Sequence, residues 1–84
     1  MYFVYVLKSQ KDKKLYYGLT DSLERRVSDH NKGSVPSTKA RRPFDLMYYE
    51  VVETVQEAQK REKYFKTGFG RKYIKNKINN GPIV

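Results

Sequence analysis

The sequence predicts a small α/β domain, in which a three-stranded sheet, antiparallel or mixed, is flanked by helices in the order β-β-α-β-α-α. Three runs rich in aromatic and β-branched residues have the length of strands. Helical segments with N-terminal capping signatures follow the second and the third of these runs. With 84 residues there is room for one domain, and such a chain packs its helices onto a small sheet.

The first two strands are predicted at residues 2–7 and 15–19. The polar residues 8–14 that join them have the length and composition of a hairpin connection. These two strands are therefore expected to pair antiparallel.

A first helix is predicted from Asp21 to about Asn31, because Asp21 followed by Glu24 has the pattern of a capping box. Gly33 is expected to end it. Residues 32–43 are polar and contain two prolines, which predicts a loop.

The third strand is predicted at residues 44–52, where the apolar residues are too continuous for a strand exposed on both faces. Its place in the sheet cannot be derived from the sequence. Thr54 and Glu57 form a second capping-box pattern, which predicts a helix from there to about Lys66.

Gly68 is expected to break this second helix, and a short third helix is predicted from Gly70 to about Ile78. The chain shows no internal repeat and no linker composition. We therefore expect one domain over residues 1–78 and a flexible C-terminal tail at 79–84.

The chain is strongly basic, with 18 Lys and Arg against 9 Asp and Glu, a net charge of +9 and a pI near 9.8. Residues 60–77 hold eight basic side chains and one acid, Glu62, with aromatic residues between the charges. Residues 32–42 are free of acids. A solvated cationic surface is the simplest explanation, but two basic clusters favour a polyanionic partner such as nucleic acid.

Other classes of protein are disfavoured by composition. There is no cysteine, so neither disulfides nor thiolate metal sites are expected. The apolar run at residues 1–7 is too short for a signal peptide, and no segment has the ~20 apolar residues of a membrane span. Residues 60–77 lack the apolar face of an interfacial helix. A soluble, cytoplasmic protein without membrane contact is expected.

Two polar side chains lie beside the apolar stripe of the first predicted helix. Leu23 and Val27 define this stripe by their i, i+4 spacing. Arg26 and His30 follow Leu23 at i+3 and i+7, so they border or share it. Alone, His30 is more often a hydrogen-bonded helix-end histidine than a catalytic residue.

Glu62 falls in the apolar row of the second predicted helix. The other members of this row are Val55, Ala58 and Phe65. A carboxylate in such a row is costly unless it is paired or binds a cation. A structural ion pair with Arg26 or Lys66 therefore stands beside a metal site as an explanation.

The combination is more informative than any single residue. Tyr5 and Tyr16 lie on the two arms of one hairpin, so strand pairing can bring their phenols close together. Arg26 follows Gly18 by eight residues, one turn into the next helix, and can reach back to the strand end.

These residues resemble the motifs of the GIY-YIG endonuclease family. Residues 3–5 (Phe-Val-Tyr) stand at the first triplet and residues 16–18 (Tyr-Tyr-Gly) at the second, so the first triplet keeps only its tyrosine. Arg26, His30 and Glu62 match the family's arginine, its His or Tyr one turn later, and its metal-binding glutamate. The resemblance covers about residues 2–73.

The Arg-Arg-Pro-Phe segment at 41–44 is similar to the small stand-alone bacterial branch, which resembles the nuclease domain of the excision-repair incision subunit. The resemblance implies a metal-dependent endonuclease that hydrolyses phosphodiester bonds in nucleic acid, with DNA favoured over RNA. The short chain leaves little surface for reading sequence, which favours selection by nucleic-acid structure. A non-catalytic nucleic-acid-binding module on the same fold is the alternative.

The catalytic residues that the resemblance implies are Tyr5, Tyr16, Arg26, His30 and Glu62. Among them Glu62 would bind a single Mg²⁺ or Mn²⁺ ion, because one carboxylate suits a metal that keeps most of its waters, whereas the ligands for zinc are missing. Either tyrosine could be the general base, and Tyr16 is our prediction. The side chains expected to bind the nucleic-acid backbone are Lys39, Arg41, Arg42, Lys66, Arg71 and Lys72.

Overall fold

The computed structural model describes residues 1–79. Its elements are β1 (Tyr2–Ser9), β2 (Leu15–Thr20), α1 (Leu23–Lys32), the 3-10 helix η1 (Lys39–Arg41), β3 (Phe44–Val52), α2 (Val55–Phe65) and α3 (Gly68–Asn79). Apart from η1, which lies inside the predicted loop, the predicted order is confirmed. No helix in the described part of the chain is long and apolar enough to cross a membrane.

The sheet has the strand order β2-β1-β3, and both pairings are antiparallel. The prediction of an antiparallel or mixed sheet is therefore resolved as antiparallel. The most apolar strand, β1, is central, and its residues 4–7 are buried. Tyr5 pairs with Gly18 on β2 and with Tyr49 on β3.

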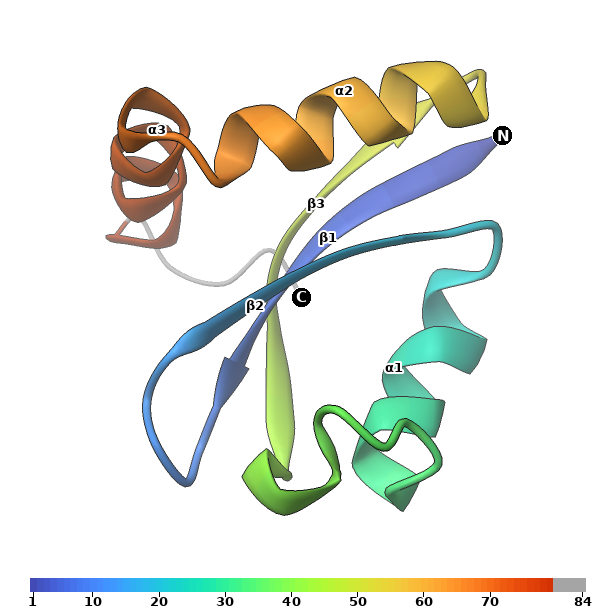
Figure 1. Ribbon diagram of the computed structural model, residues 1–84, viewed down its shortest axis with the longest axis vertical. Coiled ribbons are helices and arrows are strands. Elements are labelled where there is room, and N and C mark those ends of the chain that lie inside the picture. Colours follow the sequence, from blue (N-terminus) through green and yellow to red (C-terminus); the bar gives the residue numbers. More distant parts are fainter. Residues whose placement is uncertain (80–84) are drawn as a thin grey trace.

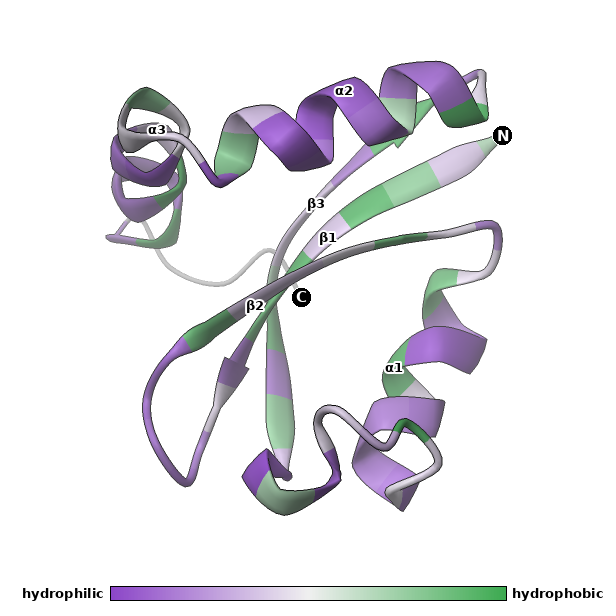
Figure 2. Cartoon of the chain, viewed as in Figure 1, coloured by the Kyte–Doolittle hydropathy of each residue, from purple (hydrophilic) through white to green (hydrophobic). Residues whose placement is uncertain are grey.

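The two faces of the sheet carry different helices, as Figure 1 shows: α2 and α3 lie on one side and α1 with η1 on the other. Figure 2 shows hydrophobic segments along β1 and β3, and mainly hydrophilic turns in α2. The buried cluster beneath α2 and α3 consists of Val4, Val6, Ala58, Phe65 and Ile74. The cluster on the α1 side consists of Tyr5, Leu7 and Phe44. Alternation along β1 thus assigns its residues to two separate cores.

The start of α1 differs from the prediction. Ser22, rather than Asp21, is the N-cap, and its side chain makes no capping hydrogen bond. The Asp21 carboxylate instead pairs with Arg25, 2.7 Å away and one turn further on. The predicted end is confirmed, because Gly33 caps the helix with a φ of 83°.

The starts of α2 and α3 depend on threonines. The Thr54 hydroxyl accepts the backbone N–H of Glu57 at 3.2 Å, which confirms the predicted cap of α2. Helix α3 begins at Gly68 rather than Gly70, since the Thr67 hydroxyl accepts the Gly70 N–H at 3.1 Å and supports the first turn. Asn79, predicted in the tail, is the last residue of α3. The rest of that tail, residues 80–84, lies outside the described residues.

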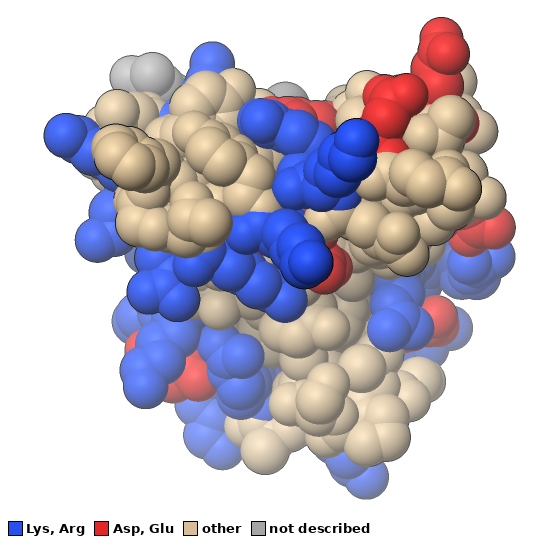
Figure 3. Space-filling model, turned by 45° about the horizontal axis from the view of Figure 1, so that its top comes forward, with Lys and Arg blue, Asp and Glu red and all other residues tan. Residues whose placement is uncertain are grey.

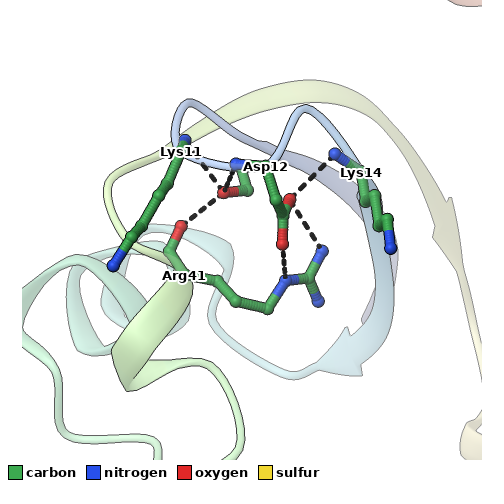
Figure 4. A network of polar contacts seen from close by, with 5 residues as sticks. Lys11, Asp12, Lys14 and Arg41 are labelled. Atoms are coloured by element: carbon green, nitrogen blue, oxygen red, sulfur yellow. Dashed lines mark hydrogen bonds and ion pairs between the residues drawn. The ribbon is translucent and has the colours of Figure 1, made fainter.

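A polar network ties the hairpin to the loop before β3 (Figure 4). The buried Ser9 hydroxyl accepts the N–H groups of Lys11 and Asp12 at 3.1 Å and donates to the Arg41 carbonyl. The Arg41 guanidinium binds the Asp12 carboxylate at 2.7 Å and holds its pKa to about 2. The Lys14 N–H donates to the same carboxylate at 2.9 Å. This network fixes the position of η1 and of the residues just before it.

Candidate active site

Tyr5 projects from the centre of β1 toward α1 and lies across Gly18. Only 1% of Tyr5 is exposed. A Cβ atom at position 18 would overlap the Tyr5 ring and its hydroxyl. The glycine of the second triplet is therefore required for space, because the phenol occupies the volume that any side chain at position 18 would need.

His30 connects this phenol to the loop after α1. The Tyr5 hydroxyl lies 2.9 Å from His30 Nε2, and His30 Nδ1 lies 2.8 Å from Thr38 Oγ1. Thr38 in turn donates its single hydroxyl proton to the Val35 carbonyl at 3.4 Å. We therefore assign the proton of His30 to Nδ1, so that Nε2 accepts the Tyr5 hydroxyl proton. All three side chains are buried.

This Tyr5–His30–Thr38 chain is uncharged at neutral pH. Burial raises the pKa of Tyr5 to about 12, although a hydrogen bond from the nearby Arg26 guanidinium opposes the rise. Burial, helped by the charge of Arg26, lowers the pKa of His30. Both shifts favour the neutral form of each group. The direction of each hydrogen bond in the buried chain is therefore fixed.

Tyr16 lies beside the same histidine but is not bonded to it. Its ring centroid is 5.0 Å from that of His30 and 6.5 Å from that of Tyr5. Tyr16 pairs with Leu7 on β1, so the predicted closeness of the two phenols is confirmed as a diagonal contact. Tyr16 is half-buried, and among residues 1–79 its hydroxyl makes no hydrogen bond. This phenol is therefore the one open to an incoming group.

Arg26 brings positive charge to these groups from the first turns of α1. It is half-buried, and its charge acts on both Tyr5 and His30. Within the described residues its guanidinium forms no ion pair, whereas its neighbour Arg25 is bound to Asp21. A partly buried guanidinium left unpaired in this way is suited to bind an anion.

Glu62 is placed apart from these four side chains, on α2 and across the sheet from α1. It lies at the margin of the apolar row and not within it, because 26% of its side chain is exposed whereas Ala58 and Phe65 are fully buried. The Lys66 ammonium is 3.7 Å from the carboxylate and is itself 54% exposed. The expected compensation by Lys66 is thus present, but as a loose surface contact.

The carboxylate of Glu62 is open to solvent. It lines a shallow hollow of about 480 Å³ together with Gln56, Gln59, Lys60 and Lys63. Its charge also contributes to raising the Tyr5 pKa, as the smallest of the causes. Since β2 is an edge strand, groups from the two faces can meet around it. The structure thus gathers Tyr5, Tyr16, Arg26 and His30, and leaves Glu62 on the opposite side of this edge.

The structure describes no ready-made metal cage, because no group of three or more His, Asp or Glu side chains gathers within residues 1–79. A single accessible carboxylate is nevertheless a suitable donor for Mg²⁺, which keeps several waters and takes further oxygens from substrate phosphates. The chemistry of the available donor therefore fits such an ion.

Two features of the structure were not predicted. The first is Thr38, which lies in a polar loop where no periodicity marks a buried side chain. The second is a half-buried network on the α2 side, in which Arg61 binds Glu50 at 2.9 and 3.0 Å and the Tyr48 hydroxyl donates to the same carboxylate. The Arg61 guanidinium also lies over the ring of Phe65, 4.9 Å from its centroid. The one sequence feature that could have indicated a half-buried Arg61 is its place next to the apolar row of α2.

The predicted nucleic-acid-binding side chains fall into two groups. Arg41 binds Asp12, and the Arg42 guanidinium donates to the Lys32 carbonyl at the end of α1 at 2.9 Å, so both also have structural roles. Lys39, Lys66, Arg71 and Lys72 are exposed, as is Arg42. Figure 3 shows Lys and Arg side chains gathered through the left and centre of the face that carries α2 and α3.

Over residues 1–79 the chain matches the family described as the GIY-YIG catalytic domain. The chain belongs to the GIY-YIG family. This is a family of nucleases, so membership implies an enzyme that binds nucleic acid. The expectation drawn from the two triplets, Arg26 and Glu62 is confirmed at the level of the family.

Bacterial members of this GIY-YIG group are similar to the chain over most of its length. The UPF0213 protein CPE1444 of Clostridium perfringens is 46% identical over 67 residues, which cover 79% of this chain and 71% of the relative. The UPF0213 protein YazA of Bacillus subtilis is 41% identical, with 99% and 87% covered. The UPF0213 protein SSP2268 of Staphylococcus saprophyticus is 40% identical, with 88% and 90% covered. These names state no activity, and no solved structure matches the chain.

Proposed function

We propose that this GIY-YIG chain is a metal-dependent endonuclease that hydrolyses phosphodiester bonds, with DNA favoured over RNA. The observation that carries the proposal is the Arg26 guanidinium, which has no ion-pair partner within residues 1–79, beside the neutral Tyr5–His30–Thr38 chain, with the Tyr16 hydroxyl open next to it. The preference for DNA rests on the resemblance to the excision-repair incision subunit.

Arg26 binds the scissile phosphate in this proposal. Its planar fork of donors matches phosphate oxygens and stabilises the negative charge that develops on them during attack. The low exposure of Tyr5 and His30 beside it keeps water from screening that interaction.

Tyr16 takes the proton of the attacking water as a phenolate, after its own hydroxyl proton has left to solvent. Among residues 1–79 its hydroxyl is free and half-exposed, whereas that of Tyr5 is buried and bonded to His30. Tyr5 keeps its proton, since its pKa is about 12, and positions Arg26. His30 positions Tyr5.

Glu62 would hold the divalent ion, which is Mg²⁺ or Mn²⁺. The ion would replace the loose contact between the Lys66 ammonium and the Glu62 carboxylate. When bound, such an ion supplies Lewis-acid stabilisation of phosphate oxygens and a lower pKa for water. The backbone on either side of the cut is bound by Lys39, Arg42, Lys66, Arg71 and Lys72, with Arg41 beside them.

The test is cleavage of labelled single-stranded, flap, branched and duplex substrates with Mg²⁺, Mn²⁺ or EDTA. Wild-type protein should cut at least one substrate only with metal. Glu62→Ala and Tyr16→Phe should each lower the rate by about 10²-fold or more. Glu57→Ala, an exposed acid on the same helix, is the matched control and should cut normally.

Metal-dependent cleavage that survives Glu62→Ala removes Glu62 as the ligand. A Tyr5→Phe variant slower than Tyr16→Phe, in which the rate no longer rises with pH, makes Tyr5 the general base instead. Binding of every substrate without cleavage by any metal favours the non-catalytic binding module.

A further inference from the structure

Phe69 is the most exposed large hydrophobic side chain among residues 1–79, at 82%. Of the neighbouring rings of the C-terminal helices, Phe65 is fully buried and Tyr73 is half-buried, whereas Tyr64 is 36% exposed. A single exposed apolar side chain is common on protein surfaces. Whether Phe69 can bind a ligand depends on the backbone that positions its ring and on the charges around it.

The backbone that carries Phe69 is rigid. The Thr67 hydroxyl donates to the Tyr64 carbonyl at 2.6 Å and accepts the Gly70 N–H at 3.1 Å, which ties the end of α2 to the start of α3. Gly70 is buried, and a Cβ atom there would overlap the Tyr64 carbonyl. The two helices therefore meet in close contact, and the ring of Phe69 projects from a fixed corner.

The charges of this corner, which we define as residues 64–72, are all positive. Lys66, Arg71 and Lys72 are exposed, and the segment holds no acid. Lys72 follows Phe69 at i+3 and so shares its side of α3. An exposed ring among cations is the composition of single-stranded nucleic-acid sites, where cations bind the backbone and rings stack on bases.

The corner lies on the α2 side of the sheet, next to the proposed metal ligand. Tyr17, which packs against the buried cluster beneath α2 and α3, is within reach of the Arg71 charge. Lys66 contacts Glu62, the proposed metal ligand. A strand bound at the proposed metal site therefore passes close to the corner that carries Phe69.

We propose that Phe69 is a stacking platform for an unpaired nucleobase, and that the substrate carries unpaired nucleotides next to the scissile bond. This inference rests on the proposed nuclease function and specifies its substrate class. In a continuous duplex each internal base is stacked on both faces, so a side chain on a convex corner has no base to contact. A single strand or a flap presents such a face.

The test is fluorescence anisotropy in EDTA, where cleavage is absent, with a labelled 20-nucleotide single strand and a labelled blunt 20-base-pair duplex. Phe69→Ala should weaken binding of the single strand about 5- to 100-fold and leave duplex binding unchanged. Phe69→Trp should retain single-strand binding. Val51→Ala, an exposed apolar residue on β3 (50% exposed), is the matched control and should change neither.

Lys72→Ala gives the contrasting pattern. It should weaken binding to both substrates and reduce the slope of log K against log salt by about 0.7–0.9, whereas Phe69→Ala should leave that slope unchanged. In a strand with 2-aminopurine, wild-type protein should alter the probe's fluorescence, and Phe69→Ala should abolish that change.

Equal effects of Phe69→Ala on both substrates, or none on either, overturn the stacking proposal. If wild-type protein still cleaves with metal in that case, the nuclease proposal stands alone. If wild-type protein neither binds nor cuts any substrate, the nuclease proposal fails first. A Phe69→Ala variant that alters only self-association assigns the ring to a protein contact and also overturns stacking.

Discussion

The two faces of the sheet each contain a polar network among aromatic rings, and the two networks are built in opposite ways. On the α2 face, Arg61 and Glu50 are both charged and are bound to each other at 2.9 and 3.0 Å. On the α1 face, Tyr5 and His30 are both neutral and are bound at 2.9 Å, while the Arg26 guanidinium beside them has no ion-pair partner within residues 1–79.

The difference shows what each network can do. Arg61 and Glu50 already bind each other, so few of their donors and acceptors remain for a ligand, and the pair serves to join α2 to β3. A neutral buried chain that orients an unpaired guanidinium can stabilise charge brought in by a substrate. We therefore expect variants on the α1 face to lose rate and variants on the α2 face to lose stability.

The largest effect is expected for Arg26→Ala. Loss of a donor to the developing phosphate charge should lower single-turnover cleavage by about 10²- to 10³-fold, with little change in Tm because the side chain has no ion-pair partner to leave behind among the described residues. Arg25→Ala, which breaks the exposed pair with Asp21, is the matched control and should cut at nearly the wild-type rate. A stable, fully active Arg26→Ala variant would contradict the comparison.

A smaller loss of rate is expected when the neutral chain is cut at its far end. Thr38→Val keeps the shape of the side chain but removes the acceptor of His30 Nδ1–H. Without this acceptor the Nδ1–H tautomer of His30 is no longer favoured, and cleavage should fall by about 10-fold. The unpaired N–H should also lower the free energy of unfolding by about 1–3 kcal/mol. Thr38→Ser keeps the hydroxyl and should restore both.

The pH dependence separates this positioning role from a packing defect. Because the folded-state pKa of His30 is lowered from 6.5, the unfolded chain binds more protons as pH falls below 6.5, and stability should decline there. The rate should decline over the same acidic range. A Thr38→Ser variant that is as slow as Thr38→Val would show that the hydroxyl does not position His30.

The sequence predicts the fold well because its signals are local and repeated. Thr54 caps α2 and Gly33 ends α1 as expected, since both act on the adjacent backbone. The capping pattern at Asp21 misleads because the carboxylate has a competing partner, Arg25, one turn away. Whether the Asp21 carboxylate caps the helix or binds Arg25 depends on side-chain geometry, which the residue types alone do not specify.

The site was predicted in part, for a related reason. Strand alternation brings Tyr5 and Tyr16 to one face, and helical spacing brings Arg26 and His30 beside them. Thr38 depends on how the loop before β3 folds back, which the Ser9 and Arg41 contacts fix over long sequence separations. No pattern within that loop records them.

The smallest effect on rate is expected on the α2 face, where Arg61→Ala should reduce stability alone. The pair is partly exposed, at 35% and 19%, so we expect a loss of about 1–3 kcal/mol in urea unfolding at pH 7 rather than the full cost of a buried pair. Cleavage per folded molecule should stay within about 2-fold of wild type, as for surface changes away from a site.

Acid should erase this difference between Arg61→Ala and wild type. Burial acts to raise the pKa of Glu50, but hydrogen bonds from Arg61 and Tyr48 outweigh it and lower the pKa below 4.5. The pair therefore stabilises the fold above that pH, and its contribution is lost as pH falls through the folded-state pKa. The two unfolding free energies should converge at low pH. If the gap between them stays constant down to the acid transition, the loss in Arg61→Ala comes from packing over Phe65 and not from the charge of Glu50.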